Sequence, residues 1–155
     1  MMVVIVGFSL GRLVYIVFFV LMCLDFFWLS YRDFKCRRVN GFHFLFWILF
    51  LVPLNLFVFE GFFWMGYAAT FTVFALTNIG FGDSLMVFTT GLFTHIGNAL
   101  YLTGQPSYTH IYLSVGVCYL GGLLLKPVFN KEKGVPLIPV LTIQFILQVS
   151  HIIFL

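Results

Sequence analysis

The sequence predicts an all-α integral membrane protein with about six transmembrane helices and no soluble domain. Of the 155 residues, 62% are hydrophobic and only 8% are charged, whereas soluble domains carry roughly 25% charged residues. Eight basic and five acidic side chains could not cover the surface of a soluble protein of this composition. The apolar residues also fall into runs close to the roughly 20 residues that a helix needs to cross a bilayer. We therefore expect a single membrane-embedded domain over residues 1–155.

Six apolar segments are candidates for membrane-spanning helices. Helices are expected rather than strands, because an isolated segment in lipid must satisfy its own backbone hydrogen bonds. In chain order the segments are 13–31, which could extend toward Met2, then 42–59, 62–79, 84–102, 111–125 and 137–155.

The basic residues predict the orientation of these segments. Seven of the eight lie in two connections, between the first and second segments and after the fifth. They are Arg32, Lys35, Arg37, Arg38, Lys126, Lys131 and Lys133. An even number of crossings places both connections on one side, and the positive-inside rule makes that side cytoplasmic. Both chain ends then face outward, and Arg12 would snorkel to the outer interface. Two short basic clusters between apolar segments do not indicate nucleic-acid binding.

Two aspartates carry most of the functional information. Asp33 follows the first segment, and Asp83 closes the motif Gly80-Phe81-Gly82-Asp83 between the third and fourth segments. Two predicted crossings separate them, so both should return to the cytoplasmic boundary. Carboxylates brought together there would share one proton, because both cannot ionise cheaply. The ionised acid could then activate a water molecule while its protonated partner polarises a scissile carbonyl. Aspartic peptidases use this chemistry, and it needs no metal or cofactor.

Each aspartate taken alone has a simpler interpretation. Asp33 could be an interfacial acid neutralised by Arg32, Lys35 or Arg37, since local ion pairs are common and weak. Asp83 could be the N-cap of the fourth helix after a tight turn. The two glycines of the motif would let the backbone run close to another element or to a bound peptide.

The order and spacing of these motifs resemble the type IV prepilin and preflagellin (prearchaellin) peptidases, which are GxGD aspartic membrane proteases. In that family an Asp at a helix end is followed by a basic stretch and a turn, and GxGD comes two crossings later. Asp33, the stretch 35–39 and the motif 80–83 match this order. Residues 131–139 resemble the family's late basic stretch, which leads into a proline-bearing final helix. The resemblance covers roughly residues 13–142.

This resemblance implies an intramembrane endopeptidase that uses no cofactor and has Asp33 and Asp83 as its catalytic pair. Its substrate would be a pilin-like precursor, cut at the cytoplasmic face of the cell membrane to remove a short basic leader. The motif and substrate-binding positions would be Gly80, Gly82, Arg37, Arg38, Asn40, Lys133, Pro136 and Pro139. No methyltransferase activity is expected, because the cysteine-rich loop of the methylating members is absent. Asn40 stands where the family has Pro, and Leu85 where members often carry Lys.

Asp25 lies eight residues before Asp33, which is about 12 Å deeper along a helix. A structural interpretation has this acid hydrogen-bonded to Asn78, Asn98 or Thr94 of other helices. The alternative is an auxiliary acid that tunes the catalytic pair or lines a water path.

Other functions remain open from the sequence. The four histidines and three cysteines show no metal-ligand or disulfide spacing, so no metal site is expected. A small proton-linked transporter could use Asp25 with His95. A non-catalytic assembly partner of a pilus or secretion system could retain the same fold. The sequence leaves homo-oligomerisation open.

Overall fold

The computed structural model describes residues 2–36, 39, 41–58, 81–101, 109–128 and 135–154, and contains no strand within these ranges. The expectation of an all-helical protein is confirmed. The helices are α1 Met2–Cys36, α2 Phe42–Val58, α4 Phe81–Tyr101, α5 Thr109–Leu125 and α6 Ile138–Phe154. They coincide with five of the six predicted segments, and the expected segment 62–79 lies outside the described residues.

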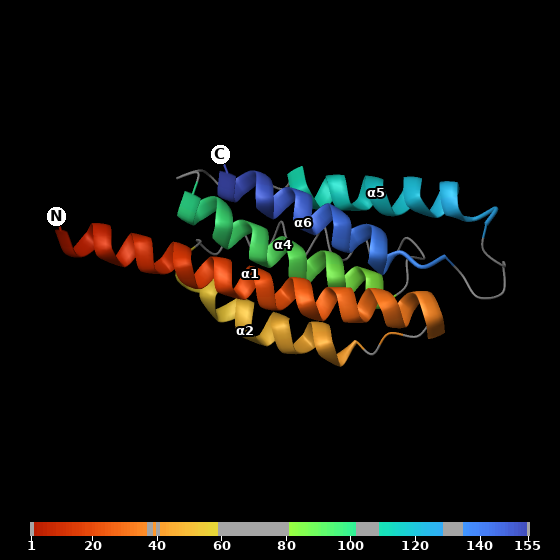
Figure 1. The fold of residues 1–155 in the computed structure, drawn as a ribbon, viewed down its shortest axis with the longest axis horizontal. Helices are drawn as coiled ribbons and strands as arrows, with labels where there is room; N and C mark the ends of the chain where they lie inside the picture. Colours follow the sequence, from red (N-terminus) through yellow and green to blue (C-terminus); the bar gives the residue numbers. More distant parts are fainter. Residues whose placement is uncertain are drawn as a thin grey trace.

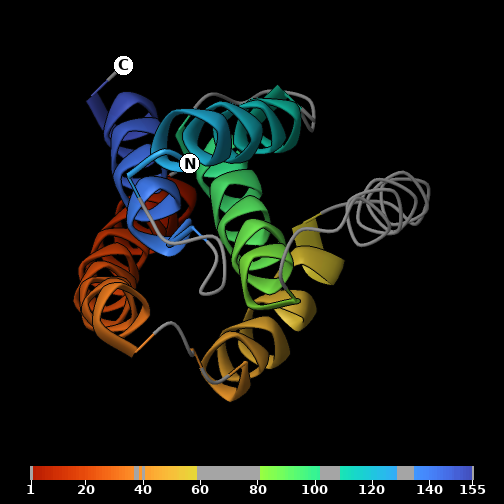
Figure 2. The ribbon, with the colours of Figure 1, turned by 90° about the vertical axis from the view of Figure 1, so that its right-hand side faces the viewer.

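The helices run side by side along the long axis of the molecule (Figure 1). The end of α1, the starts of α2, α4 and α6, and the end of α5 all lie at one end of the bundle, which we call the Asp33 end. Both chain termini lie at the opposite end. The view along the bundle shows α4 surrounded by its neighbours (Figure 2), and α4 contacts α1, α2, α5 and α6. This topology places the first turn of α4 and the last turn of α1 at the same end of the bundle.

The central position of α4 agrees with its polar composition. Thr89, Thr94 and His95 are buried within the bundle. The Thr89 hydroxyl donates to the Leu85 carbonyl at 2.8 Å, and the Thr94 hydroxyl donates to the Thr90 carbonyl at 2.7 Å. Such hydrogen bonds to the preceding turn let hydroxyl groups be buried without other partners.

The outer surface of the described helices carries many large apolar side chains, whereas a soluble protein places most such side chains in its core. Leu13, Leu24 and Phe34 of α1 are 59%, 63% and 60% exposed, although side chains of this kind normally form a core. Within the described residues, one helical stretch, Leu10–Cys36, is long and apolar enough to cross a membrane. The apolar helices Phe42–Leu56 and Ile138–Phe154 are shorter.

The end of the bundle opposite Asp33 carries a contact that the sequence did not reveal. The Nε atom of Arg12 donates to the Leu100 carbonyl at 3.2 Å, and its guanidinium lies 4.8 Å from the centre of the Tyr101 ring. The last carbonyls of a helix have no partner within the helix and carry partial negative charge. Arg12 therefore donates a hydrogen bond to one of the carbonyl groups that have no helical partner at the C-terminal end of α4.

Candidate active site

Asp33 lies in the last turn of α1 and reaches the start of α6. The backbone N–H of Ile138 donates to Asp33 Oδ2 at 3.3 Å. Ile138 is the first residue of α6, where N–H groups lack partners within the helix and the helix dipole is positive. This position favours a negative charge on Asp33 and fixes the direction of its carboxylate.

A second contact between α1 and α6 lies about one turn deeper. The hydroxyl oxygens of Ser30 and Thr142 are 2.9 Å apart. Thr142 donates its own proton to the Ile138 carbonyl at 2.8 Å, so Ser30 is the donor to Thr142. Together with the Asp33 contact, this hydrogen bond sets the height of α6 against α1.

The two prolines expected near the site define the start of α6. Pro136 is buried just before the helix, and Pro139 is its second residue. Proline suits the first turn, because the N–H that it lacks would have no helical partner there. Their placement leaves the N–H of Ile138 directed at Asp33.

Asp83 lies in the first turn of α4, immediately before the predicted span 84–102, and it is partly buried. Burial, and to a smaller extent the negative charge of Asp33, together raise the pKa of the Asp83 carboxyl from the ordinary 3.8 to about 7. Asp33 and Asp83 therefore lie at the same end of the bundle, and the charge of Asp33 reaches the Asp83 carboxyl.

The motif that contains Asp83 differs from the expected tight turn. Helix α4 already begins at Phe81, so Gly82 and Asp83 are helical and Asp83 is not an N-cap. A Cβ atom on Gly82 would meet no atom of the described chain within 4 Å. Within the described residues, no other element approaches Gly82 closely, and Gly80 lies outside them.

Leu85, which replaces the lysine of the resembled family, is 5% exposed and belongs to the core. It packs the interior of the bundle rather than facing a substrate. Five other positions expected from the resemblance lie outside the described residues. They are Arg37, Arg38, Asn40, Gly80 and Lys133.

No protein-family model, curated protein or solved structure matches this chain.

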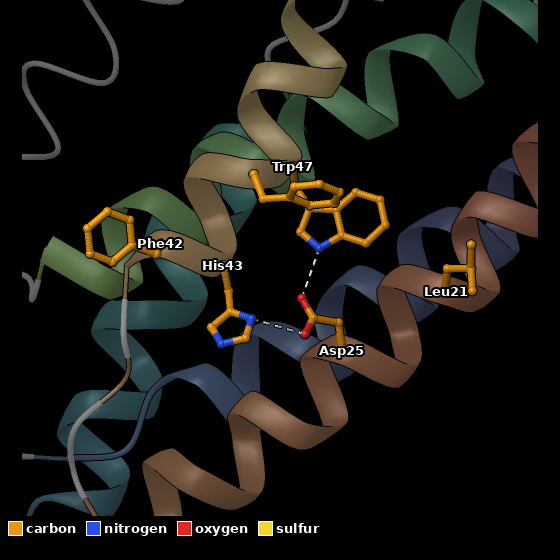
Figure 3. A pocket seen from close by; sticks show the side chains of 6 residues that line it. Leu21, Asp25, Phe42, His43 and Trp47 are labelled. Carbon is orange, nitrogen blue, oxygen red and sulfur yellow. Dashed lines mark hydrogen bonds and ion pairs between the residues drawn. The ribbon is translucent and has the colours of Figure 1, made fainter.

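Asp25 has different partners from those expected. Trp47 Nε1 donates to Asp25 Oδ2 at 2.9 Å, and His43 Nδ1 lies 3.5 Å from Asp25 Oδ1 (Figure 3). Both partners come from α2, so the expected hydrogen bonds to Thr94 or Asn98 of α4 are not what holds this side chain. Asn78, the third expected partner, lies outside the described residues.

Sequence reasoning missed the residues that orient the acids. Ser30, Thr142 and the Ile138 N–H depend on the register between α1 and α6, which are far apart in sequence. His43 and Trp47 likewise depend on the offset between α1 and α2. No motif marks these positions. Within the described ranges, no group of three His, Cys, Asp or Glu residues lies together.

Proposed function

We propose that this protein is an aspartic endopeptidase of the membrane that removes the short basic leader of pilin-like precursors. The observation that carries the proposal is the placement of Asp33 and Asp83 at the same end of the bundle. These residues are 50 positions apart, yet the charge of one reaches the other. The order of their motifs resembles the prepilin and preflagellin peptidases, and the substrate class is taken from that resemblance.

The two acids have environments suited to different roles. Asp33 accepts the Ile138 N–H at the positive end of α6, which favours its ionised form. Asp83 is buried and close to that charge, which favours its protonated form. Titratable groups whose environments differ in this way can serve as the base and the acid of one reaction.

The reaction would proceed through a water molecule held between the two carboxyl groups. Asp33 takes a proton from the water as its oxygen attacks the scissile carbonyl carbon, and Asp83 gives its proton to the carbonyl oxygen. The resulting gem-diol collapses when the proton on Asp33 passes to the leaving amide nitrogen and Asp83 recovers a proton from a diol hydroxyl. The bond between carbon and nitrogen breaks, and both acids return to their starting states.

The proposed setting is a multi-pass membrane protein with about six spans and its Asp33 end at the cytoplasmic face. The apolar outer surface of the described helices supports a lipid environment. The basic residues near this end, among them Arg32, Lys35 and Lys126, support the cytoplasmic orientation. A precursor whose hydrophobic helix stays in lipid would present its leader junction at this boundary.

The proposal is tested by co-expressing the full chain with a pilin-like precursor and reading the N-terminus of the product by mass spectrometry. Asp33→Asn and Asp83→Asn should each abolish leader removal while the variant still accumulates in the membrane. Asp25→Asn is the matched control, because it removes an acid from the same helix but not from the pair. Normal processing by either variant of the pair would refute the proposal.

A further inference from the structure

Asp25, His43 and Trp47 form a polar cluster between α1 and α2 that the proposed peptide hydrolysis does not use. The cluster lines a cavity of about 550 Å³ whose other walls are apolar (Figure 3). These walls are Leu21, Phe42 and Phe46. The helices that complete the catalytic pair, α4 and α6, contribute none of the lining residues. The cavity is therefore separate from the site of Asp33 and Asp83.

The Asp25 carboxylate is hydrogen-bonded, and none of the lysine or arginine side chains in the described part of the chain forms an ion pair with it. Its oxygens meet the Trp47 indole N–H at 2.9 Å and the His43 ring at 3.5 Å. Indole is neutral, and His43 is positive only when protonated. Each carboxylate oxygen has two acceptor positions, so one on each oxygen is left for a further donor.

The apolar walls indicate what kind of cation would complete the cluster. Trp47 is 7% exposed and meets Asp25 with its N–H edge, so the exposed apolar contact for a ligand comes mainly from the Phe46 ring, which is 66% exposed. The Phe46 and Trp47 rings lie edge to face, with centres 5.6 Å apart. A metal ion would have to exchange its hydration shell for one carboxylate and one imidazole, which is fewer ligands than protein metal sites supply. An organic ammonium ion instead brings hydrogen-bond donors together with an apolar body.

We propose that this cavity binds a small organic ammonium compound, with one protonated amine and an apolar body. The ammonium group donates to Asp25, and the apolar body packs against Phe46 and Trp47. Cavities of roughly 300–1,000 Å³ are typical of small-molecule sites. Leu21 and Phe46 are 48% and 66% exposed, so the ligand reaches the cavity from the outer face of the pair formed by α1 and α2.

The test compares two ligands of nearly equal shape, 2-phenylethylammonium and the neutral 2-phenylethanol. Binding to the full chain in a neutral detergent is measured by equilibrium dialysis. The wild type should bind the ammonium compound at least about tenfold more tightly than the alcohol. Asp25→Asn should remove this preference, and Asp25→Glu should restore most of it. Equal affinity for the two ligands in the wild type, or an unchanged preference in Asp25→Asn, would overturn the proposal.

Two further variants locate the ligand. Phe46→Ala removes an exposed wall of the cavity without touching the core, and it should weaken binding of both ligands severalfold. Asp33→Asn removes the other acid in the cytoplasmic half of α1, and it should bind both ligands as the wild type does. Binding that survives Phe46→Ala unchanged, or that is lost in Asp33→Asn, would place the ligand elsewhere and overturn the assignment.

Discussion

The backbone N–H of Ile138 donates a hydrogen bond to Oδ2 of Asp33 over 3.3 Å. The two residues are 105 positions apart in the sequence. The contact places an acid from the end of α1 at the positive end of α6. It gives Asp33 an environment that Asp83, buried in the first turn of α4, does not share.

The rate of leader removal should fall as the pH rises through about 7. The proposed mechanism needs a protonated Asp83, and burial together with the charge of Asp33 raises the pKa of this carboxyl to about 7. Above that pH the acid that protonates the carbonyl oxygen is lost. The measurement is the initial rate of precursor processing by the purified protein from about pH 5 to about pH 9. A rate that stays constant across this range would contradict the assignment of Asp83 as the acid.

Asp83→Asn should stabilise the folded protein at alkaline pH. Because the pKa of Asp83 is 3.8 ordinarily and about 7 when folded, the folded state binds more protons than the unfolded state between these values. The contribution of Asp83 to the free energy of unfolding is therefore greatest at low pH and falls as the pH rises from about 3.8 toward 7. Each unit of difference between the folded and unfolded pKa corresponds to ~1.36 kcal/mol, so the free energy of unfolding falls by at most about 4 kcal/mol.

Thermal unfolding in detergent at about pH 4 and about pH 8 measures this effect. The variant and the wild type should differ little at the lower pH, and the variant should unfold at a higher temperature at the upper one. A difference of the same size at both pH values would show that burial of Asp83 has no stability cost linked to its ionisation.

Gly97→Ala should destabilise the bundle by about 1–3 kcal/mol. A Cβ atom at this position would collide with the hydroxyl of Tyr15 on α1. The Tyr15 ring cannot move freely, because it stacks on Phe93 with ring centres 4.3 Å apart. Gly116→Ala is the matched control, since a Cβ there meets no described atom within 4 Å. Thermal unfolding should show a lower midpoint for Gly97→Ala and no loss for Gly116→Ala.

Cys36 should react with a membrane-impermeant maleimide from the cytoplasmic side. Its side chain is exposed at the Asp33 end of α1. Labelling is compared in intact cells and inverted vesicles, with Cys23 and Cys118 replaced by alanine. As a control, Leu10→Cys in a background without Cys36 places a thiol toward the other end of α1, where Leu10 is 59% exposed, and it should label from the outside. Labelling of Cys36 in intact cells would reverse the proposed orientation.

The sequence determined the helical fold class and the positions of the described helices. Hydrophobic runs alone predict helices wherever the surroundings are apolar, because the backbone N–H and C=O groups must then form hydrogen bonds within their own segment. The predicted ends differ by several residues where polar residues continue a helix. Helix α1 extends through Asp33 to Cys36, and α4 begins at Phe81, so the expected turn before Asp83 is partly helical. Counting the predicted crossings also places Asp33 and Asp83 at the same end of the helices.

Only the tertiary structure decided how each acid is held. Whether Asp33 meets a helix terminus, and whether Asp25 faces α2 or α4, depends on the rotation and height of each helix against its neighbours. Hydropathy does not encode these quantities when most faces of a helix are apolar. They are fixed by side-chain packing and by hydrogen bonds between distant residues, such as Ser30 with Thr142 and Trp47 with Asp25.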